Sequence, residues 1–255
     1  MRLDYHIHTE HLGCADKTMK IEKIADYCQE LGVEEIAITD HLNKREEVDL
    51  HRKVKNEILQ LDHELKIYFG AELNFIEEFG DFAADKDIKE EIGFQFFIGG
   101  IHSAYGTDRE PMEILKTQHL HHLETCKNEL VKVLVHPYWF SAGTLEKMPW
   151  LTDLKKLPEK WVEELAQTAI KTDTVIEINY HAIFSNDNYK DSFKRSYKDF
   201  ICQLKKYGVK FAMATDAHNI EHLKEVKLIE ELFDELNIPE AQIWSPSFFD
   251  IREVN

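Results

Sequence analysis

The sequence predicts an α/β fold in which parallel strands and helices alternate around a barrel, and three observations support this prediction. Short apolar segments of strand length alternate with longer segments of helical periodicity along the whole chain. No segment rich in Pro, Gly or Ser interrupts them, so we expect a single domain over residues 1–255. About seven or eight such units in one domain favour a closed barrel over an open sheet.

The predicted strands are apolar, and most of them end at a polar side chain. The first strand carries His6 and His8 at its end, and Pro137 is expected to stop the fifth strand. A short apolar segment at 242–244 is the candidate for an eighth strand. The seven main strands are expected at residues 3–8, 35–39, 66–72, 95–102, 131–136, 174–179 and 210–215.

The predicted helices lie between the strands. In the first, Ile21 and Cys28 share an apolar face and Gly32 follows as a C-cap, while Pro111 suits the first turn of a later helix. The segment 140–157 has no regular pattern and is long enough to be an active-site loop. Helices are expected at 20–31, 45–63, 85–92, 111–130, 158–171, 188–207 and 220–236.

Charge and composition limit the possible partners. The formal net charge is −17, which argues against nucleic acid and against an anionic membrane surface. It does not exclude a small anionic substrate, because bound divalent cations can reverse the local field. The four cysteines form no CxxC pair, no apolar run is long enough to cross a membrane, and the chain begins with a predicted strand rather than a signal peptide. We therefore expect a cytoplasmic protein.

Residues able to bind a metal recur at the ends of the predicted strands. His6 and His8 are one residue apart, so both side chains lie on the same face of their strand and can hold one ion. In a barrel the carboxyl ends of the strands meet at one mouth, where active sites lie. Candidates at such positions are His6, His8, His41, Glu72, His102, His136, Asp216 and His218.

Imidazole and carboxylate ligands together suit zinc, manganese or iron. About eight ligands are too many for one four-coordinate ion. We therefore expect two to three divalent ions with at least one bridging carboxylate. Such clusters generate a hydroxide near neutral pH and stabilise leaving oxygens, which favours hydrolysis, with phosphate esters as the leading substrate class.

The order of these motifs resembles the PHP (polymerase and histidinol phosphatase) family. The motifs are His6-Ile-His8, Ile38-Thr-Asp-His41, Gly70-Ala-Glu72, Gly100-Ile-His102-Ser, Val135-His136-Pro and Thr215-Asp216-Ala-His218. The resemblance covers residues 3–218 and implies a distorted seven-stranded (β/α)7 TIM-like barrel with a trinuclear metal site.

The resemblance also implies how the ligands divide among three ions. Glu72 would bridge the first and second ions. The first ion would also be held by His6, His8 and Asp216, the second by His102 and His136, and the third by His41 and His218.

One further third-site ligand is expected after the His6 and His8 pair, where this chain departs from the family's usual spacing. His11, Cys14 and Asp16 all follow the pair. Our prediction is Asp16, with His11 second.

Other polar residues are further candidates for ligands or substrate contacts. His119, His121 and His122 lie within a predicted helix and are interpreted as a solvated face, and His51, His63 and His222 as surface residues. Asp40 precedes a ligand and is either an orienting partner or a strand-end cap. Asn179 and His181 are either substrate contacts or packing residues. Arg45 and Arg109 are candidates for binding a phosphate.

The function expected from these residues is hydrolysis of a small phosphomonoester by a metal-bound hydroxide, with no separate catalytic side chain. By resemblance, histidinol phosphate is one plausible substrate. An amidohydrolase-type enzyme acting on C–N bonds also opens with two such histidines, although Glu72 fits it less well. A catalytically silent metal-binding module is the third alternative.

Overall fold

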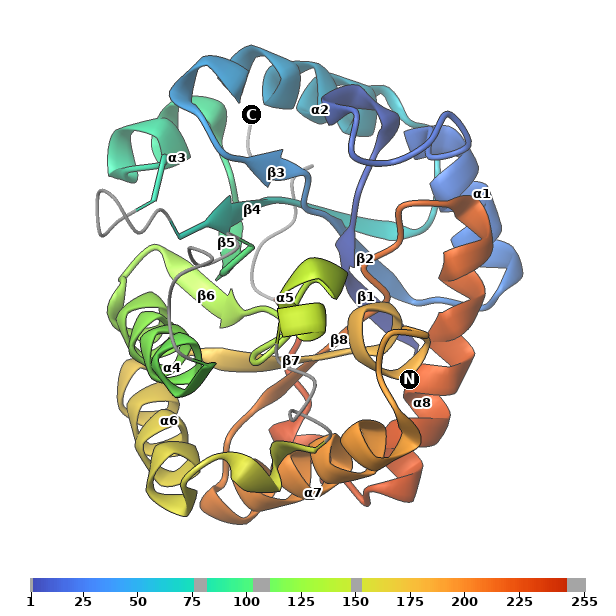
Figure 1. Ribbon diagram of the computed structural model, residues 1–255. Coiled ribbons are helices and arrows are strands. Elements are labelled where there is room, and N and C mark those ends of the chain that lie inside the picture. Colours follow the sequence, from blue (N-terminus) through green and yellow to red (C-terminus); the bar gives the residue numbers. More distant parts are fainter. Residues whose placement is uncertain (1, 76–81, 103–110, 148–152, 247–255) are drawn as a thin grey trace.

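The structure is a computed structural model that describes residues 2–75, 82–102, 111–147 and 153–246. Its strands form one curved sheet in the order β1-β2-β4-β5-β6-β7-β8, in which all neighbours are parallel. Helices surround the sheet (Figure 1). The strands are β1 Leu3–Ile7, β2 Glu35–Ile38, β3 His41–Leu42, β4 Lys66–Asn74, β5 Phe96–Gly100, β6 Val131–Leu134, β7 Val175–Asn179 and β8 Phe211–Ala214.

The sheet nearly closes into a barrel between β8 and β1. Just beyond β8, the amide of Asp216 donates to the carbonyl of His6 at 2.9 Å, and the amide of His8 donates to the carbonyl of Ala217 at 3.1 Å. Short β3 lies beside β4 with His41 opposite Glu72. The predicted seven-stranded TIM-like α/β barrel is thereby confirmed.

Most of the helices cover the outside of the barrel with an apolar face turned toward it, whereas α5 lies over its centre (Figure 1). In α1, for example, Ile21, Ile24 and Cys28 are buried. Among the described residues, no helix combines the length and apolar character that crossing a membrane requires. The helices are α1 Ile21–Glu30, α2 Val48–Gln60, α3 Lys86–Ile92, α4 Pro111–Lys127, α5 Ala142–Lys147, α6 Glu159–Thr172, α7 Asp191–Tyr207 and α8 Val226–Glu235.

Several expected elements differ from the structure, and the helices expected at 45–63 and 220–236 each begin with a 3-10 turn. The segment 140–157 contains helix α5 and a 3-10 turn, Leu154–Lys156, while residues 148–152 lie outside the described part of the chain. The expected eighth strand is a single bridge between Ile243 and Phe211, because the chain makes a 3-10 turn at Glu240–Gln242 immediately before it. The chain after β7 forms an unexpected π-helix, Tyr180–Phe184, and α7 starts at Asp191 rather than at residue 188.

Candidate metal centre

The eight strand-end candidates come together at the carboxyl end of the barrel. His6 lies within β1 and Glu72 within β4, both on strands whose residues are almost all buried. His8, His102 and His136 lie just beyond β1, β5 and β6. His41 lies in β3, and Asp216 and His218 lie just beyond β8.

Glu72 is the centre of this cluster. Its Oε2 lies 2.9 Å from His41 Nδ1 and 3.2 Å from His6 Nε2. Its Oε1 lies 3.0 Å from His102 Nε2 and 3.3 Å from His136 Nε2. Both carboxylate oxygens are buried without a hydrogen-bond partner among the described residues. Burying a carboxylate is costly unless its charge is compensated, and metal ions held by Glu72 and the surrounding histidines would compensate it.

Asp216 is a second carboxylate in the cluster. Its Oδ1 lies 3.2 Å from His8 Nε2, 3.5 Å from His6 Nε2 and 3.5 Å from His218 Nδ1. Its backbone has a positive φ of 57°, and that of His136 is also positive, at 26°. Positive φ is unfavourable for residues other than glycine and often marks functional sites.

Glu177 on β7 orients two of the candidate ligands. Its Oε1 lies 2.6 Å from His6 Nδ1, and its Oε2 accepts from the amide of His136 at 2.7 Å and from Asn179 Nδ2 at 3.0 Å. A carboxylate at Nδ1 fixes the imidazole so that Nε2 faces the cluster. Sequence reasoning missed this role, although the period of a strand places Glu177 and Asn179 on one face.

Asp40 and Asp4 hold the backbone around the ligands. Asp40 accepts from the amide of Thr9 at 2.6 Å and from its hydroxyl at 2.5 Å, while its Oδ1 lies 4.0 Å from His8 Nδ1. Asp4 accepts from the amide and hydroxyl of Thr215, at 2.9 and 2.5 Å. Burial raises the pKa of Asp40 to about 6 and that of Asp4 to about 7.

The charges of the cluster interact strongly, and its carboxylates raise the pKa of His6, His41 and His136 despite their burial. Burial raises the pKa of Glu72, but His102, His41 and His6 lower it more, so it lies well below its usual value. The pKa of Asp216 is likewise well below normal, because nearby histidines outweigh the effect of burial. Burial lowers the pKa of His8 to about 3, which keeps this imidazole neutral, the form that binds metals.

In the part of the chain that the structure describes, the ligand atoms form three groups, each compact enough to hold an ion. One group contains His6, His8 and Asp216, and another contains His41, Glu72 and His102. The third group contains His8, Cys14, His41 and His218. Within each group, the ligand atoms lie within 4.8 Å of one another. The donor sets and the unpartnered carboxylate of Glu72 therefore fit a multinuclear cluster.

The structure places the expected third-site ligand elsewhere, and we revise that expectation. Asp16 is exposed, and its carboxylate accepts from the amide of Thr18 at 2.7 Å and from the side chain of Asn219. His11, the second choice, pairs with Glu57 at 3.0 Å. From this connection, Cys14 is the side chain that reaches the cluster, with its Sγ 3.7 Å from His8 Nδ1.

The residues expected to contact the substrate do not all lie at the cluster. Arg45 pairs with Asp85 at 2.8 Å and is mostly exposed, away from the cluster. Asn179 is buried and donates to Asp216 Oδ2 at 3.2 Å, so its side chain positions a candidate ligand. His181 lies at the mouth of the cluster. Arg109 lies outside the described residues.

The interpretation of the helix histidines as a solvated face is wrong for two of them. His119 and His122 are each about 1% exposed. His119 Nδ1 lies 2.9 Å from the Tyr138 hydroxyl, and its ring stacks on Trp161. His122 Nε2 accepts from the amide of Tyr138 at 3.0 Å. Both histidines pack inside the protein between α4 and its neighbours, and neither belongs to a candidate ligand group.

The three expected surface histidines are also less exposed than predicted. His51 is fully buried, and its Nε2 lies 3.0 Å from the carbonyl of His41. The side chain of His63 is 7% exposed and lies 3.6 Å from Asp26. His222 stacks on His181, with ring centroids 3.9 Å apart.

A cavity of about 570 Å³ opens over the cluster. Its floor contains the candidate ligands Glu72, His102, His136 and Asp216, and Trp139 forms part of the wall. Its rim comes mainly from the chain after β7, with His181, Ala182, Ser185, Asn186, Asp187 and Asn188.

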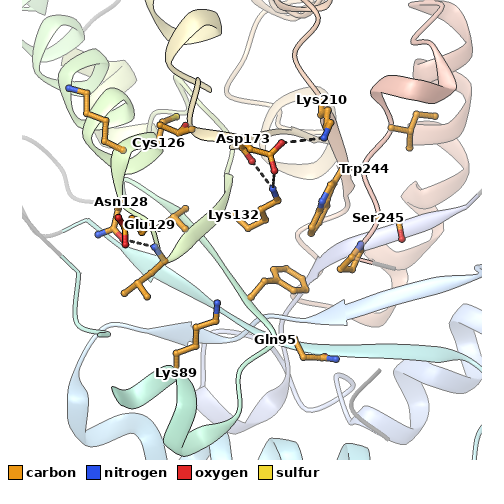
Figure 2. A pocket seen from close by; sticks show the side chains of 17 residues that line it. Lys89, Gln95, Cys126, Asn128, Glu129, Lys132, Asp173, Lys210, Trp244 and Ser245 are labelled. Atoms are coloured by element: carbon orange, nitrogen blue, oxygen red, sulfur yellow. Dashed lines mark hydrogen bonds and ion pairs between the residues drawn. The ribbon is translucent and has the colours of Figure 1, made fainter. Parts of the chain in front are cut away.

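A larger cavity of about 880 Å³ lies at the opposite end of the barrel, near the starts of β5, β6 and β8. Figure 2 shows Lys132 and Lys210 paired with Asp173, close to Trp244. None of the candidate metal ligands lines this cavity, whereas several of them line the smaller one.

The chain is similar to known proteins in sequence and in fold. The chain is 24% identical over 233 residues to the DNA polymerase/3′-5′ exonuclease PolX of Bacillus subtilis (strain 168). The match covers 88% of this chain but only 35% of that protein, so the chain spans about a third of the polymerase's length.

A solved structure is also similar, that of the "putative histidinol phosphatase hisK" from Listeria monocytogenes, with a TM-score of 0.60. The match covers 87% of this chain and 97% of that one, and at 15% identity it shows a shared fold. The family model described as the PHP domain matches residues 4–181, which contain most of the candidate ligands. The chain belongs to the PHP domain family.

Proposed function

We propose that this protein is a metal-dependent phosphoesterase that hydrolyses a small phosphomonoester at the cluster around Glu72. The observation that carries the proposal is the environment of that carboxylate. It is buried, lacks hydrogen-bond partners among the described residues and faces imidazole nitrogens on both of its oxygens. Two to three divalent ions, zinc, manganese or iron, would supply an activated water and neutralise the phosphate oxygens when bound.

The chain's own groups would prepare this reaction by fixing the ligands. Glu177 holds the ring of His6 and the backbone of His136, while Asn179 holds Asp216. Both supporting side chains are buried, so the ligands they hold have little freedom to move. Such preorganisation lowers the cost of reaching a productive arrangement.

A small substrate is favoured by the size of the cavity and by charge. A volume of about 570 Å³ is in the usual range for small-molecule sites, roughly 300–1,000 Å³. The net charge of −17 disfavours a nucleic-acid partner. Histidinol phosphate is the named candidate, by family resemblance and from the name of the Listeria protein. The free cysteines and the absence of a CxxC pair support a cytoplasmic location.

The test is hydrolysis of p-nitrophenyl phosphate by protein loaded with Mn²⁺ or Zn²⁺, with a chelator as the negative control. A phosphodiester and an amide substrate are assayed in parallel. We expect turnover of the monoester, its loss with chelator, and its loss in Glu72→Gln but not in the exposed control Glu163→Gln. Turnover of the amide alone would support the C–N hydrolase alternative, and no turnover of any substrate with metal bound would support a silent module.

A further inference from the structure

A phosphomonoesterase must supply a proton to the leaving alcohol, and few groups in the cavity can do so. Among the described residues that line it there is no lysine or arginine. The carboxylates and most histidines of the floor are candidate metal ligands. Their oxygen and nitrogen atoms would be occupied when metal is bound and could not donate a proton. Outside that set, the titratable side chains of the described lining are His181 and Asp187.

His181 is held in a way that suits a proton donor. Its Nδ1 lies 3.2 Å from Glu225 Oε1, and its ring stacks on His222 at 3.9 Å. No partner is found for its Nε2 among the described residues, and the side chain is 36% exposed, in the cavity rim. A carboxylate on one ring nitrogen with the other nitrogen free is the arrangement of many general acids and bases.

The backbone that carries His181 is also unusual. The residue lies in the π-helix Tyr180–Phe184 immediately after β7, and π-helical turns are frequent at functional sites. Asn179, which caps this turn, accepts from the amide of Ala182 at 2.8 Å and also donates to Asp216. The turn is therefore tied directly to the metal-ligand cluster.

We propose that His181 is the general acid of the reaction and that Glu225 and His222 are its positioning residues. This inference rests on the proposed phosphatase function. As the bond between phosphorus and the alcohol oxygen breaks, its electron pair goes to that oxygen, which takes the proton from His181 Nε2 and leaves as the alcohol. Water adds its oxygen to phosphorus and releases a proton to solvent, and His181 takes up a proton from solvent. Over the whole cycle, the ester and water give the alcohol and phosphate.

The charged groups around His181 favour its protonated form. Glu225, from the turn Ile220–Glu225, raises the pKa of His181 through their hydrogen bond, and Asp216 at the end of β8 adds to this. Burial and the neighbouring His181 lower the pKa of His222, which keeps it neutral. Asp187 is a further carboxylate in the rim. Of the two stacked rings, the one at the cavity is therefore favoured to hold the proton.

The test compares two substrates that differ in their need for a proton. Nitrophenolate leaves p-nitrophenyl phosphate without one, whereas the alkoxide of glycerol phosphate needs it. The key variant is His181→Asn, because its amide still donates to Glu225 but cannot act as an acid. We expect kcat for glycerol phosphate to fall about 100-fold or more, and kcat for p-nitrophenyl phosphate to change less than about 3-fold, with unchanged metal content.

A second variant tests the positioning role. Glu225→Gln keeps an acceptor for His181 Nδ1 but removes the charge, so the alkaline limb of kcat/KM should move to lower pH. The pKa of His181 measured by NMR should fall in the same variant. Glu221→Gln, in the same turn but exposed and paired with Lys224, is the matched control and should change neither.

Each alternative outcome has a definite meaning. An equal fall for both substrates in His181→Asn, or a rise in KM with kcat unchanged, would overturn the general-acid role and leave the phosphatase function standing. An unchanged rate for glycerol phosphate would overturn it as well. A metal-loaded wild-type protein that hydrolyses neither substrate would overturn the proposed function, and this inference with it.

Discussion

Replacing Glu177 by Gln tests whether the groups behind the ligands control metal binding. The carboxylate of Glu177 receives hydrogen bonds from His6 Nδ1, from the His136 amide and from Asn179, at 2.6, 2.7 and 3.0 Å. All three partners are donors when His6 presents Nε2 to a metal. The amide of Gln has only one acceptor oxygen, so its NH₂ group must face at least one of these donors.

The expected magnitude follows from the bonds that are lost. A buried hydrogen bond to a charged group contributes about 1.5–3 kcal/mol. Removing a partner that orients a metal ligand typically lowers metal affinity about 10–100-fold, or about 1.4–2.7 kcal/mol. The two estimates agree, so we expect Glu177→Gln to bind metal about 10–100-fold more weakly while the barrel still folds.

The assay is metal retention against increasing concentrations of a competing chelator, followed by elemental analysis. Glu163→Gln is the matched control, since Glu163 is an exposed α6 residue that accepts only from Gln167 among the described contacts. Circular dichroism shows whether the variant is folded. Retention by folded Glu177→Gln equal to that of wild type would refute the reasoning that this carboxylate orients the ligands.

The remaining predictions concern the third site, pH and metal removal. Cys14→Ser should lower metal content by about one ion per chain and abolish the sulfur-to-metal absorption band of the cobalt-loaded protein, whereas Asp16→Ala should do neither; the reverse pattern would restore Asp16 as the ligand. Burial holds the pKa of His122 well below the usual 6.5, so below pH 6.5 only the unfolded chain takes up this proton. The free energy of unfolding therefore decreases as the pH is lowered, by up to about 1.4 kcal/mol per pH unit. His122→Gln, which can still accept from the Tyr138 amide, should reduce this slope in chemical denaturation, and an unchanged slope would contradict the assignment. When the free metal concentration is about 100 times its dissociation constant, removing the metal should lower the free energy of unfolding by about 2.7 kcal/mol. Calorimetry should then show a melting temperature that is lower by several degrees.

The positions that sequence reasoning placed well are those governed by strand geometry. Alternation along a strand and the common mouth of a parallel barrel were sufficient to bring His6, Glu72, His102 and Asp216 together. These residues lie in or next to buried strands, where the backbone leaves little choice of direction. Glu177 obeys the same rule, but its function depends on which partners face it across the barrel, and the pattern of one strand does not contain that information.

The positions that sequence reasoning placed poorly depend on loops and on helix packing. The connection after β1 turns at Gly13, whose φ is 77°, and this turn brings Cys14 rather than Asp16 to the cluster. In α4, His119 and His122 look polar in sequence, yet they are buried by contacts with Trp161 and Tyr138. Neither a loop conformation nor a long-range packing partner can be read from local periodicity.

The number of metal ions per chain tests the central claim most directly. Elemental analysis of wild type, Glu72→Gln and His121→Ala, all purified without chelators, is the measurement. A bridging carboxylate uses both oxygens and a neutral amide does so poorly, whereas His121 lies outside every candidate ligand group among the described residues. We predict two to three divalent ions in wild type and in His121→Ala, and clearly fewer in Glu72→Gln. One ion or none in wild type, or loss of metal in His121→Ala with full retention in Glu72→Gln, would contradict the account.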